Sequence, residues 1–349
     1  MSTADRVSRL REQLREGDCD AVLITQADNR RYVTGFTGTA GAVLITASAA
    51  RLLTDFRYIE QATQQAPEFE VVKIQRLHEG LAEQVDELGL SSLAFESEDM
   101  TVKQHTELSE ALDEAESQVE LRPVTDWVEA ARASKDDNEI AALRRVVLIG
   151  DRTMEDVALT MRPGMTEREV AWQLEVGMRE RGADGLSFDI IVAAGPNGAM
   201  PHHHPTDRPL QAGEPIVIDM GARLDGYCSD LTRTFVLGEP DERFWEVYTT
   251  VLRAQQTCEV KLKAGLSGVE ADALAREVIE AAGYGDQFGH GTGHGVGLAI
   301  HEAPRLSPIA SDDPFPEGCV VTVEPGIYLP DWGGVRIEDM VVVGADGIE

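Results

Sequence analysis

The stretch IVIDMGARLDGYCSDLTRTF, residues 216–235, decides how the C-terminal part of the chain folds. Two apolar runs flank the dipeptide Asp225-Gly226, which favours the tight two-residue turn of a β-hairpin. With that turn, residues on the same face of the two strands differ by an odd number, as Asp219 and Asp230 do. We therefore expect their carboxylates to be diagonal neighbours, with backbones about 7 to 8 Å apart. Two exposed surface acids are the alternative, which the surrounding apolar residues disfavour.

A second pair of acids is expected in VTVEPGIY (residues 321–328) and GGVRIED (residues 333–339). If about five residues connect these strands, Tyr328 opposes Gly334, and Glu324 opposes Glu338 on one face. Arg336 shares that face, so a structural pair bridged by arginine is the alternative interpretation. Burying like charges without a partner is costly, and a cation that both hairpins share resolves this cost.

The histidines cluster in two irregular segments. GHGTGHGVG, residues 289–297, has glycine at every second position, which opposes a helix and therefore a zincin-type pair of His290 and His294. Neither a P-loop nor a Rossmann turn fits its flanks. Six of the eight histidines lie at His290, His294, His301 and residues 202–204. The alternative is that the glycines merely permit close packing and a histidine is polar filler.

Four carboxylates with at least one imidazole suit two divalent ions, such as Mn²⁺ or Co²⁺, better than one structural zinc. Two ions about 3.5 to 4 Å apart can share a water, lower its pKa and hold a substrate carbonyl. The residues alone therefore predict a hydrolytic site.

The order of elements predicts a duplication. We expect a helix over residues 137–161, a second one capped by Thr166 and Glu169, and then the first hairpin. The same order recurs with a helix over residues 241–263, a helix capped by Ser267 and Glu270, and the second hairpin. Residues 1–128 read as a compact α/β domain and residues 132–349 as the duplicated α+β domain. A site between the two copies is expected.

Strands of the α/β domain are expected at residues 21–25, 42–46, 51–54, 71–74 and 92–95, and helices at about 5–16, 79–88 and 102–116.

Composition excludes several classes of partner. Among 349 residues, 31 Lys and Arg against 62 Asp and Glu give a net charge of −31, which disfavours nucleic-acid and anionic-membrane binding. No run of 18 apolar residues is present, so we expect no membrane span. The four cysteines are far apart, which is typical of reduced thiols and a cytoplasmic protein. Salt adaptation and a simple solubility bias both explain the acidity.

Four ordered motifs resemble the pita-bread metallopeptidases, specifically the Xaa-Pro dipeptidases (prolidases) and aminopeptidases P. They are residues 216–235, HGTGHGVGLAIHEAPR (residues 290–305), and residues 321–328 and 333–339. DNRRYVTGFTGTAG (residues 28–41) and LLTDFRYIEQA (residues 52–62) resemble the creatinase-like N-terminal domain of the same group, so the resemblance covers nearly the whole chain. It implies a creatinase-like α/β domain followed by a pita-bread domain with pseudo-twofold symmetry.

The resemblance also implies roles for individual residues. Asp219 and Asp230 would ligate metal with Asp230 bridging, His294 and Glu324 would bind the second ion, and Glu338 would bridge both. Glu324 would also be the general acid/base. His202, His290 and His301 would bind substrate and stabilise the transition state, although His203 and His204 leave the choice within that run open. Arg336 would hold a ligand or the substrate.

Hydrolysis of an Xaa-Pro dipeptide is the expected activity, with two divalent ions, Mn²⁺ first and Co²⁺ or Zn²⁺ as alternatives. An Xaa-Pro bond has no N–H, and a site that grips the carbonyl with metals needs none. Arg305 would bind the free carboxylate of a dipeptide bidentately; a surface arginine is the alternative.

An Xaa-Pro aminopeptidase acting on longer peptides is the nearest rival activity. Methionine aminopeptidase is disfavoured because those enzymes usually lack the N-terminal domain, and creatinase because the ligand set is complete. A non-enzymatic interaction protein of the same fold is a remote alternative. The family further implies a homodimer. The ending GADGIE is shorter than expected for a final strand, so the true C-terminus could lie further on.

Overall fold

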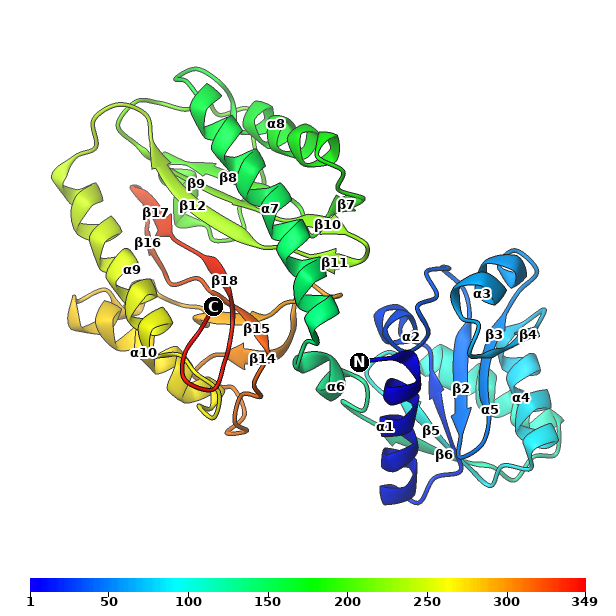
Figure 1. Cartoon of the computed structure of the whole chain (residues 1–349). Helices are drawn as coiled ribbons and strands as arrows, with labels where there is room; N and C mark the ends of the chain where they lie inside the picture. The colour runs from blue at the N-terminus through cyan, green and yellow to red at the C-terminus, as the bar shows by residue number, and fades with distance from the viewer. The chain divides into compact units, whose positions relative to one another are not determined.

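The computed structural model describes all 349 residues, which form two compact units, residues 1–132 and 133–349 (Figure 1). The sequence placed the boundary between residues 128 and 132. None of the helices is long and apolar enough to cross a membrane.

Unit 1 is built around a six-stranded mixed sheet with the order β4-β3-β2-β1-β5-β6. β2 runs antiparallel to both β1 and β3, whereas the other neighbouring pairs are parallel. The central strands β1, β2 and β5 are buried on both faces, because helices cover both sides of the sheet (Figure 1). The elements are α1 (Thr3–Glu16), β1 (Ala21–Ile24), α2 (Ala27–Thr34), β2 (Ala42–Thr46), β3 (Ala50–Thr54), α3 (Ile59–Gln65), β4 (Glu70–Lys73), α4 (Leu77–Leu88), β5 (Ser92–Glu96), α5 (Val102–Glu114), β6 (Glu120–Val124) and α6 (Glu129–Ala133).

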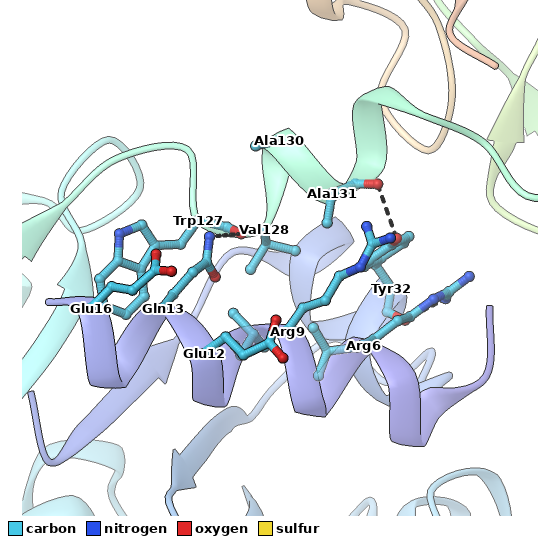
Figure 2. A pocket seen from close by; sticks show the side chains of 12 residues that line it. Arg6, Arg9, Glu12, Gln13, Glu16, Tyr32, Trp127, Val128, Ala130 and Ala131 are labelled. Carbon is cyan, nitrogen blue, oxygen red and sulfur yellow. Dashed lines mark hydrogen bonds between the residues drawn. The ribbon is translucent and has the colours of Figure 1, made fainter. Parts of the chain in front are cut away.

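The last segment of unit 1, residues 127–131, packs against α1 and α2. Gln13 Nε2 donates to the carbonyl of Trp127 at 3.0 Å, and Tyr32 Oη donates to the carbonyl of Ala131 at 3.1 Å. Figure 2 shows these contacts on the walls of a cavity of about 310 Å³. They fix residues 127–131 to the α/β unit rather than leaving them as a free linker.

The first half of unit 2 places two helices beside short antiparallel sheets. α7 and α8 pack together, and β9 pairs with β8 on one side and β12 on the other. Capping boxes start both helices, at Asp136 with Glu139 and at Thr166 with Glu169. The elements are α7 (Asp137–Thr160), α8 (Glu167–Glu180), β7 (Gly185–Leu186), β8 (Ile191–Ala194), a 3-10 turn η1 (Gly195–Ala199), β9 (Pro215–Met220), β10 (Ala222–Leu224), β11 (Tyr227–Cys228) and β12 (Leu231–Val236).

The second half repeats this order. α9 and α10 pack together, and a sheet follows with the order β14-β13-β15-β18. Each half has its own hydrophobic core, as expected for a duplicated unit of two helices and a sheet. The elements are α9 (Glu242–Lys261), α10 (Gly268–Ala281), a 3-10 turn η2 (Gly285–Gln287), β13 (Gly293–Gly295), β14 (Glu302–Leu306), β15 (Val320–Val323), β16 (Gly326–Leu329), β17 (Gly333–Arg336) and β18 (Asp339–Val342).

Both predicted hairpin registers are observed. Asp219 pairs with Thr232, so Asp230 lies diagonally across from Asp219 on the same side. Tyr328 pairs with Gly334 in the second hairpin, as the sequence predicts. Its connection is shorter than the expected five residues, because Leu329 and Gly333 also pair.

Candidate metal centre

One cavity of about 570 Å³ in unit 2 brings the predicted residues together. Both hairpins and the two histidine segments contribute to its wall. All ten predicted site residues line it: His202, Asp219, Asp230, His290, His294, His301, Arg305, Glu324, Arg336 and Glu338. A cavity of this size suits a small ligand.

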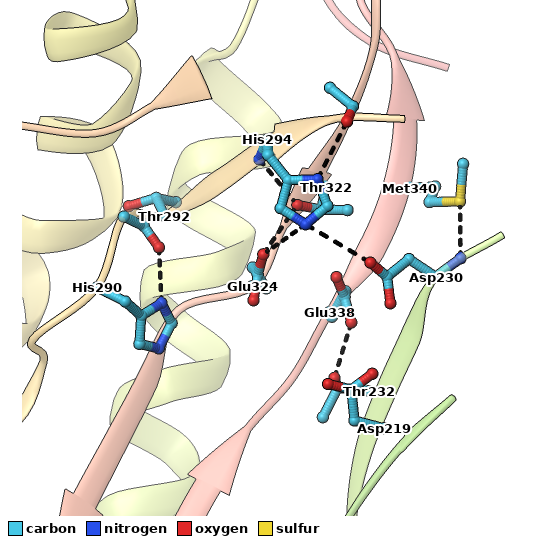
Figure 3. A network of polar contacts seen from close by, with 12 residues as sticks. Asp219, Asp230, Thr232, His290, Thr292, His294, Thr322, Glu324, Glu338 and Met340 are labelled. Atoms are coloured by element: carbon cyan, nitrogen blue, oxygen red, sulfur yellow. Dashed lines mark hydrogen bonds and ion pairs between the residues drawn. The ribbon is translucent and has the colours of Figure 1, made fainter. Parts of the chain in front are cut away.

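His294, on β13, contacts both Glu324 and Asp230 (Figure 3). Its Nδ1 lies 3.1 Å from the carbonyl of Gly295, to which a protonated Nδ1 donates. Its Nε2 is therefore free to face the carboxylates, 3.3 Å from Glu324 Oε1 and 3.6 Å from Asp230 Oδ2. Orientation of one ring nitrogen by a carbonyl acceptor is a common way to present the other to a metal.

Glu338 lies below His294 in Figure 3 and is 1% exposed. Thr232 Oγ1 donates to Glu338 Oε2 at 2.7 Å, which fixes the carboxylate from the neighbouring hairpin (Figure 3). Ligand atoms of Asp230, His294 and Glu338 all lie within 4.8 Å of one another. One acid from each hairpin, Asp230 and Glu338, thus meets His294 at a common point.

The crowding of buried carboxyls changes their protonation. Burial raises the pKa of Asp230 well above its ordinary value, and the charges of Glu338 and Asp219 raise it further. Burial also raises the pKa of Glu338 well above normal, with Glu324 adding to the effect. The pKa of Asp219 is raised by burial although Arg336 opposes the shift. Such a cluster gains free energy from a cation.

Glu324 behaves differently from the other acids. Burial alone would raise its pKa, but the hydrogen bond and charge of His294 lower it below the ordinary value. Thr322 Oγ1 also donates to Glu324 Oε1 at 3.1 Å. Glu324 is therefore the ionised carboxylate of the group, which suits a proton acceptor.

The donor set fits a divalent metal ion. Asp219 Oδ1 is buried and has no hydrogen-bond partner, whereas its Oδ2 accepts from Arg336 Nη2 at 2.7 Å. A buried carboxylate oxygen without a donor needs another positive partner. Carboxylate oxygens with one imidazole nitrogen are a suitable set for Mn²⁺, Co²⁺ or Zn²⁺.

A chain of hydrogen bonds joins His290 to the acids. His290 Nδ1 lies 2.8 Å from the carbonyl of Gly291, and its Nε2 lies 2.9 Å from Tyr328 Oη. Arg336 Nη1 donates to the same Tyr328 oxygen at 2.8 Å and its Nε donates to Thr232. Arg336 therefore contacts Asp219 directly but reaches Glu338 only through Thr232.

All three consecutive histidines line the cavity, but they differ in burial. His203 is buried, and its Nε2 lies 2.9 Å from Glu167 Oε2. His202 and His204 are exposed. His301 lies close to the acid cluster, with its ring centroid 4.3 Å from that of His294.

Sequence reasoning missed Tyr328 and Thr232 as members of the site. Both lie inside quoted motifs, but only their hydrogen bonds across the hairpins reveal a role. It also missed the apolar wall formed by Phe188, Ile191 and Ile300, which comes from segments far apart in the chain.

Comparisons with known proteins agree with this architecture. Residues 141–345 match the model of metallopeptidase family M24, and residues 6–134 match the creatinase/prolidase N-terminal domain. An uncharacterized peptidase of Bacillus subtilis is 42% identical over 98% of this chain and 96% of its own length, and an Xaa-Pro dipeptidase of Pyrococcus horikoshii is 35% identical over 98% and 95%.

Two solved structures have nearly the same fold over nearly the whole chain. The Xaa-Pro dipeptidase from Bacillus anthracis has a TM-score of 0.96 and 44% identity, covering 100% of this chain and 97% of that one. The X-Pro aminopeptidase from Thermotoga maritima has a TM-score of 0.90 and 38% identity, covering 99% and 96%. The chain therefore belongs to metallopeptidase family M24 and is an Xaa-Pro metallopeptidase with a creatinase-like N-terminal domain.

Proposed function

We propose that this enzyme hydrolyses Xaa-Pro dipeptides, with Mn²⁺ as the preferred ion and Co²⁺ or Zn²⁺ as alternatives. We infer the preference for dipeptides from the position of Arg305. It pairs with His294 across β13 and β14, and opposed residues of antiparallel strands share a face. A free guanidinium thus lines the cavity beside the acid cluster, where it can bind the carboxylate of a dipeptide.

The proposal divides five residues between two divalent ions. Asp219 and Asp230 would hold one ion and His294 and Glu324 the other, with Asp230 and Glu338 available to both. Divalent cations held by these residues would supply a water of lowered pKa and a polarised substrate carbonyl.

Proton transfer is assigned to Glu324. Its lowered pKa keeps it ionised, so it can accept a proton from the attacking water and deliver it to the leaving proline nitrogen. His202, His290 and His301 line the same cavity and are proposed to bind the substrate and stabilise the developing charge. Burial lowers the pKa of both His290 and His301, which favours their neutral forms.

Replacing Arg305 by Ala tests the substrate class. We expect the KM for an Xaa-Pro dipeptide to rise about tenfold or more, because a charge-assisted hydrogen bond to the substrate is lost. The KM for Xaa-Pro-Yaa-Zaa should change less than about threefold, because the C-terminal carboxylate of this longer peptide does not follow the proline directly. Steady-state kinetics on both peptides measures the difference, and Arg253→Ala, an exposed change on α9, is the control.

An equal effect of Arg305→Ala on both peptides would favour an Xaa-Pro aminopeptidase, the second candidate. That candidate is supported by the similarity to the Thermotoga maritima enzyme. Reconstituting metal-depleted protein with Mn²⁺, Co²⁺ or Zn²⁺ and comparing the two peptides tests the metal and the peptide length together.

Tyr328→Phe tests the hydrogen-bond chain between His290 and Arg336. The pKa of Tyr328 is raised to about 12, chiefly by burial, so its hydroxyl stays protonated in the working pH range. Removal of the hydroxyl leaves buried polar atoms of His290 and Arg336 without this partner. We expect kcat/KM to fall by about 5- to 100-fold with bound metal unchanged. Unchanged kcat/KM would show that the chain has no part in the reaction.

We also propose that the enzyme is a cytoplasmic homodimer, as in the family. Light scattering of the purified chain tests the dimer, and a monomer at micromolar concentration would reject it.

A further inference from the structure

A buried carboxylate outside the acid cluster holds the loop that carries His202. Glu167 is the first residue of α8 and its side chain is 0% exposed. Its Oε1 accepts from the backbone N–H of Ala194 and from Asn197 Nδ2, both at 2.9 Å. Its Oε2 lies 2.9 Å from His203 Nε2.

The same Oε2 also binds Thr206, at the C-terminal end of the loop. It accepts from the backbone N–H of Thr206 at 2.9 Å and from Thr206 Oγ1 at 2.7 Å. One carboxylate therefore ties together residues at 194, 197, 203 and 206. Burial works to raise the pKa of Glu167, yet hydrogen bonds from Ala194, Thr206 and Asn197 lower it below the ordinary value, so it stays charged.

This anchoring has a direct consequence for His202. His202 lies between two anchored positions, Asn197 and His203, and its side chain lines the cavity, as those of His203 and His204 also do. The preceding carbonyl, that of Pro201, lies 3.5 Å from Arg336 Nη1, at the limit of a hydrogen bond. The His202 backbone is thus held by the Glu167 carboxylate on both sides and by a turn in which the His203 N–H donates to the carbonyl of Met200 at 3.2 Å.

The second half of the unit uses an analogous contact. Asp272 on α10 is 1% exposed and accepts from the backbone N–H of Thr292 at 2.9 Å. Arg276, paired with Asp272, donates to the carbonyl of His290 at 2.6 Å. In both halves, a buried acid on the second helix holds the histidine loop that follows it. The two acids stand at different positions of their helices, Glu167 at the first residue of α8 and Asp272 one turn into α10, yet both bind a loop that carries a site histidine.

We propose that Glu167 is a positioning residue, which orients His202 toward the substrate without touching the substrate itself. The inference rests on the proposed function, because it assigns His202 a contact made in the transition state. A group that is misplaced by about 1 Å can cost a factor on the order of 100 in rate.

Glu167→Gln tests this role. The amide keeps the size of the side chain, but its NH₂ group faces N–H and O–H donors and cannot accept from them. We expect kcat to fall about 10- to 100-fold, with KM within about threefold and with two metal ions still bound per chain. Glu169→Gln is the matched control, because Glu169 is exposed, lies on the same helical turn and contacts only the helix cap.

A double-mutant cycle separates positioning from general structural damage. In a His202→Ala background, Glu167→Gln should lower kcat by less than about twofold, because the group that it positions is gone. An equal loss in both backgrounds, or loss of metal from Glu167→Gln, overturns the proposal. If Glu167→Gln does not fold, Thr206→Val removes one donor of the same set, and a kcat equal to that of the wild type overturns the proposal too. Failure of the wild type to cleave any Xaa-Pro peptide would instead reject the proposed function.

Discussion

Glu324→Gln is expected to lower kcat/KM for an Xaa-Pro substrate by a factor between about 10² and 10⁴. The amide cannot accept a proton from water, and it is a weaker partner for both His294 and a divalent ion. Because the pKa of Glu324 is lowered in the folded protein, mainly by His294 against the effect of burial, the wild-type residue is ionised and ready to act near neutral pH.

Metal analysis of the Glu324→Gln protein separates the two possible causes of this loss. Two ions per chain with little turnover would identify proton transfer as the lost step, whereas one ion per chain would identify the lost ligand. Glu317→Gln, an exposed change before β15, provides the control for expression and handling. Turnover within about threefold of the wild type would reject the assigned role of Glu324.

Chelation is expected to abolish turnover and to leave a protein in which Asp230 and Glu338 lower the stability as the pH rises. The pKa values of Asp230 and Glu338 are raised, first by burial and then by neighbouring carboxylates. A carboxyl whose folded pKa is raised stabilises the fold fully below the unfolded pKa, and this stability is lost as pH rises through the folded pKa. These groups therefore destabilise the metal-free protein at pH 8 relative to pH 4.

Asp230→Asn isolates this effect, because the amide keeps the shape and removes one buried charge. At pH 8 without metal, we expect the variant to melt at least about 2 °C above the wild type, and the difference should shrink toward pH 4. With saturating Mn²⁺ the order should reverse, because the wild type binds the ions more tightly. Thermal melts of both proteins at pH 8 and pH 4, with chelator or with Mn²⁺, measure these differences. A metal-free variant that melts below the wild type at pH 8 would contradict the proposed strain among the acids.

Much of the fold and the acid set could be predicted because these features depend on local patterns. Asp225-Gly226 set the register of the first hairpin, and Asp219 and Asp230 then had to share a side. The capping boxes at Thr166 and Ser267 marked helix starts, both of which are observed. The number of carboxylates indicated two ions, and the resemblance to a known family supplied the individual roles, which spacing alone did not.

Other elements could not be predicted, because packing rather than propensity produces them. β13 consists of Gly293, His294 and Gly295, a sequence with little preference for a strand. It forms a strand because β14 and β15 lie on either side, and a Cβ on Gly293 would lie 1.9 Å from the carbonyl oxygen of Thr322. The alternating glycines therefore permit close backbone packing, and His294 still lines the cavity. Close packing by the glycines and a histidine in the site, which are alternatives on the sequence alone, are thus both compatible with the structure.

The sequence by itself determined the two hairpins, the acids they carry and the order of the repeated elements, because turn chemistry and strand alternation act over a few neighbouring residues. Only the tertiary structure decided which histidine of residues 202–204 pairs with a buried carboxylate, which hydroxyls hold the carboxylates, and which buried acid anchors each loop. Those contacts join residues up to 106 positions apart, as Thr232 and Glu338 are. No local pattern encodes such a pair, because the hydrogen bond stabilises the protein only after folding has buried both partners together.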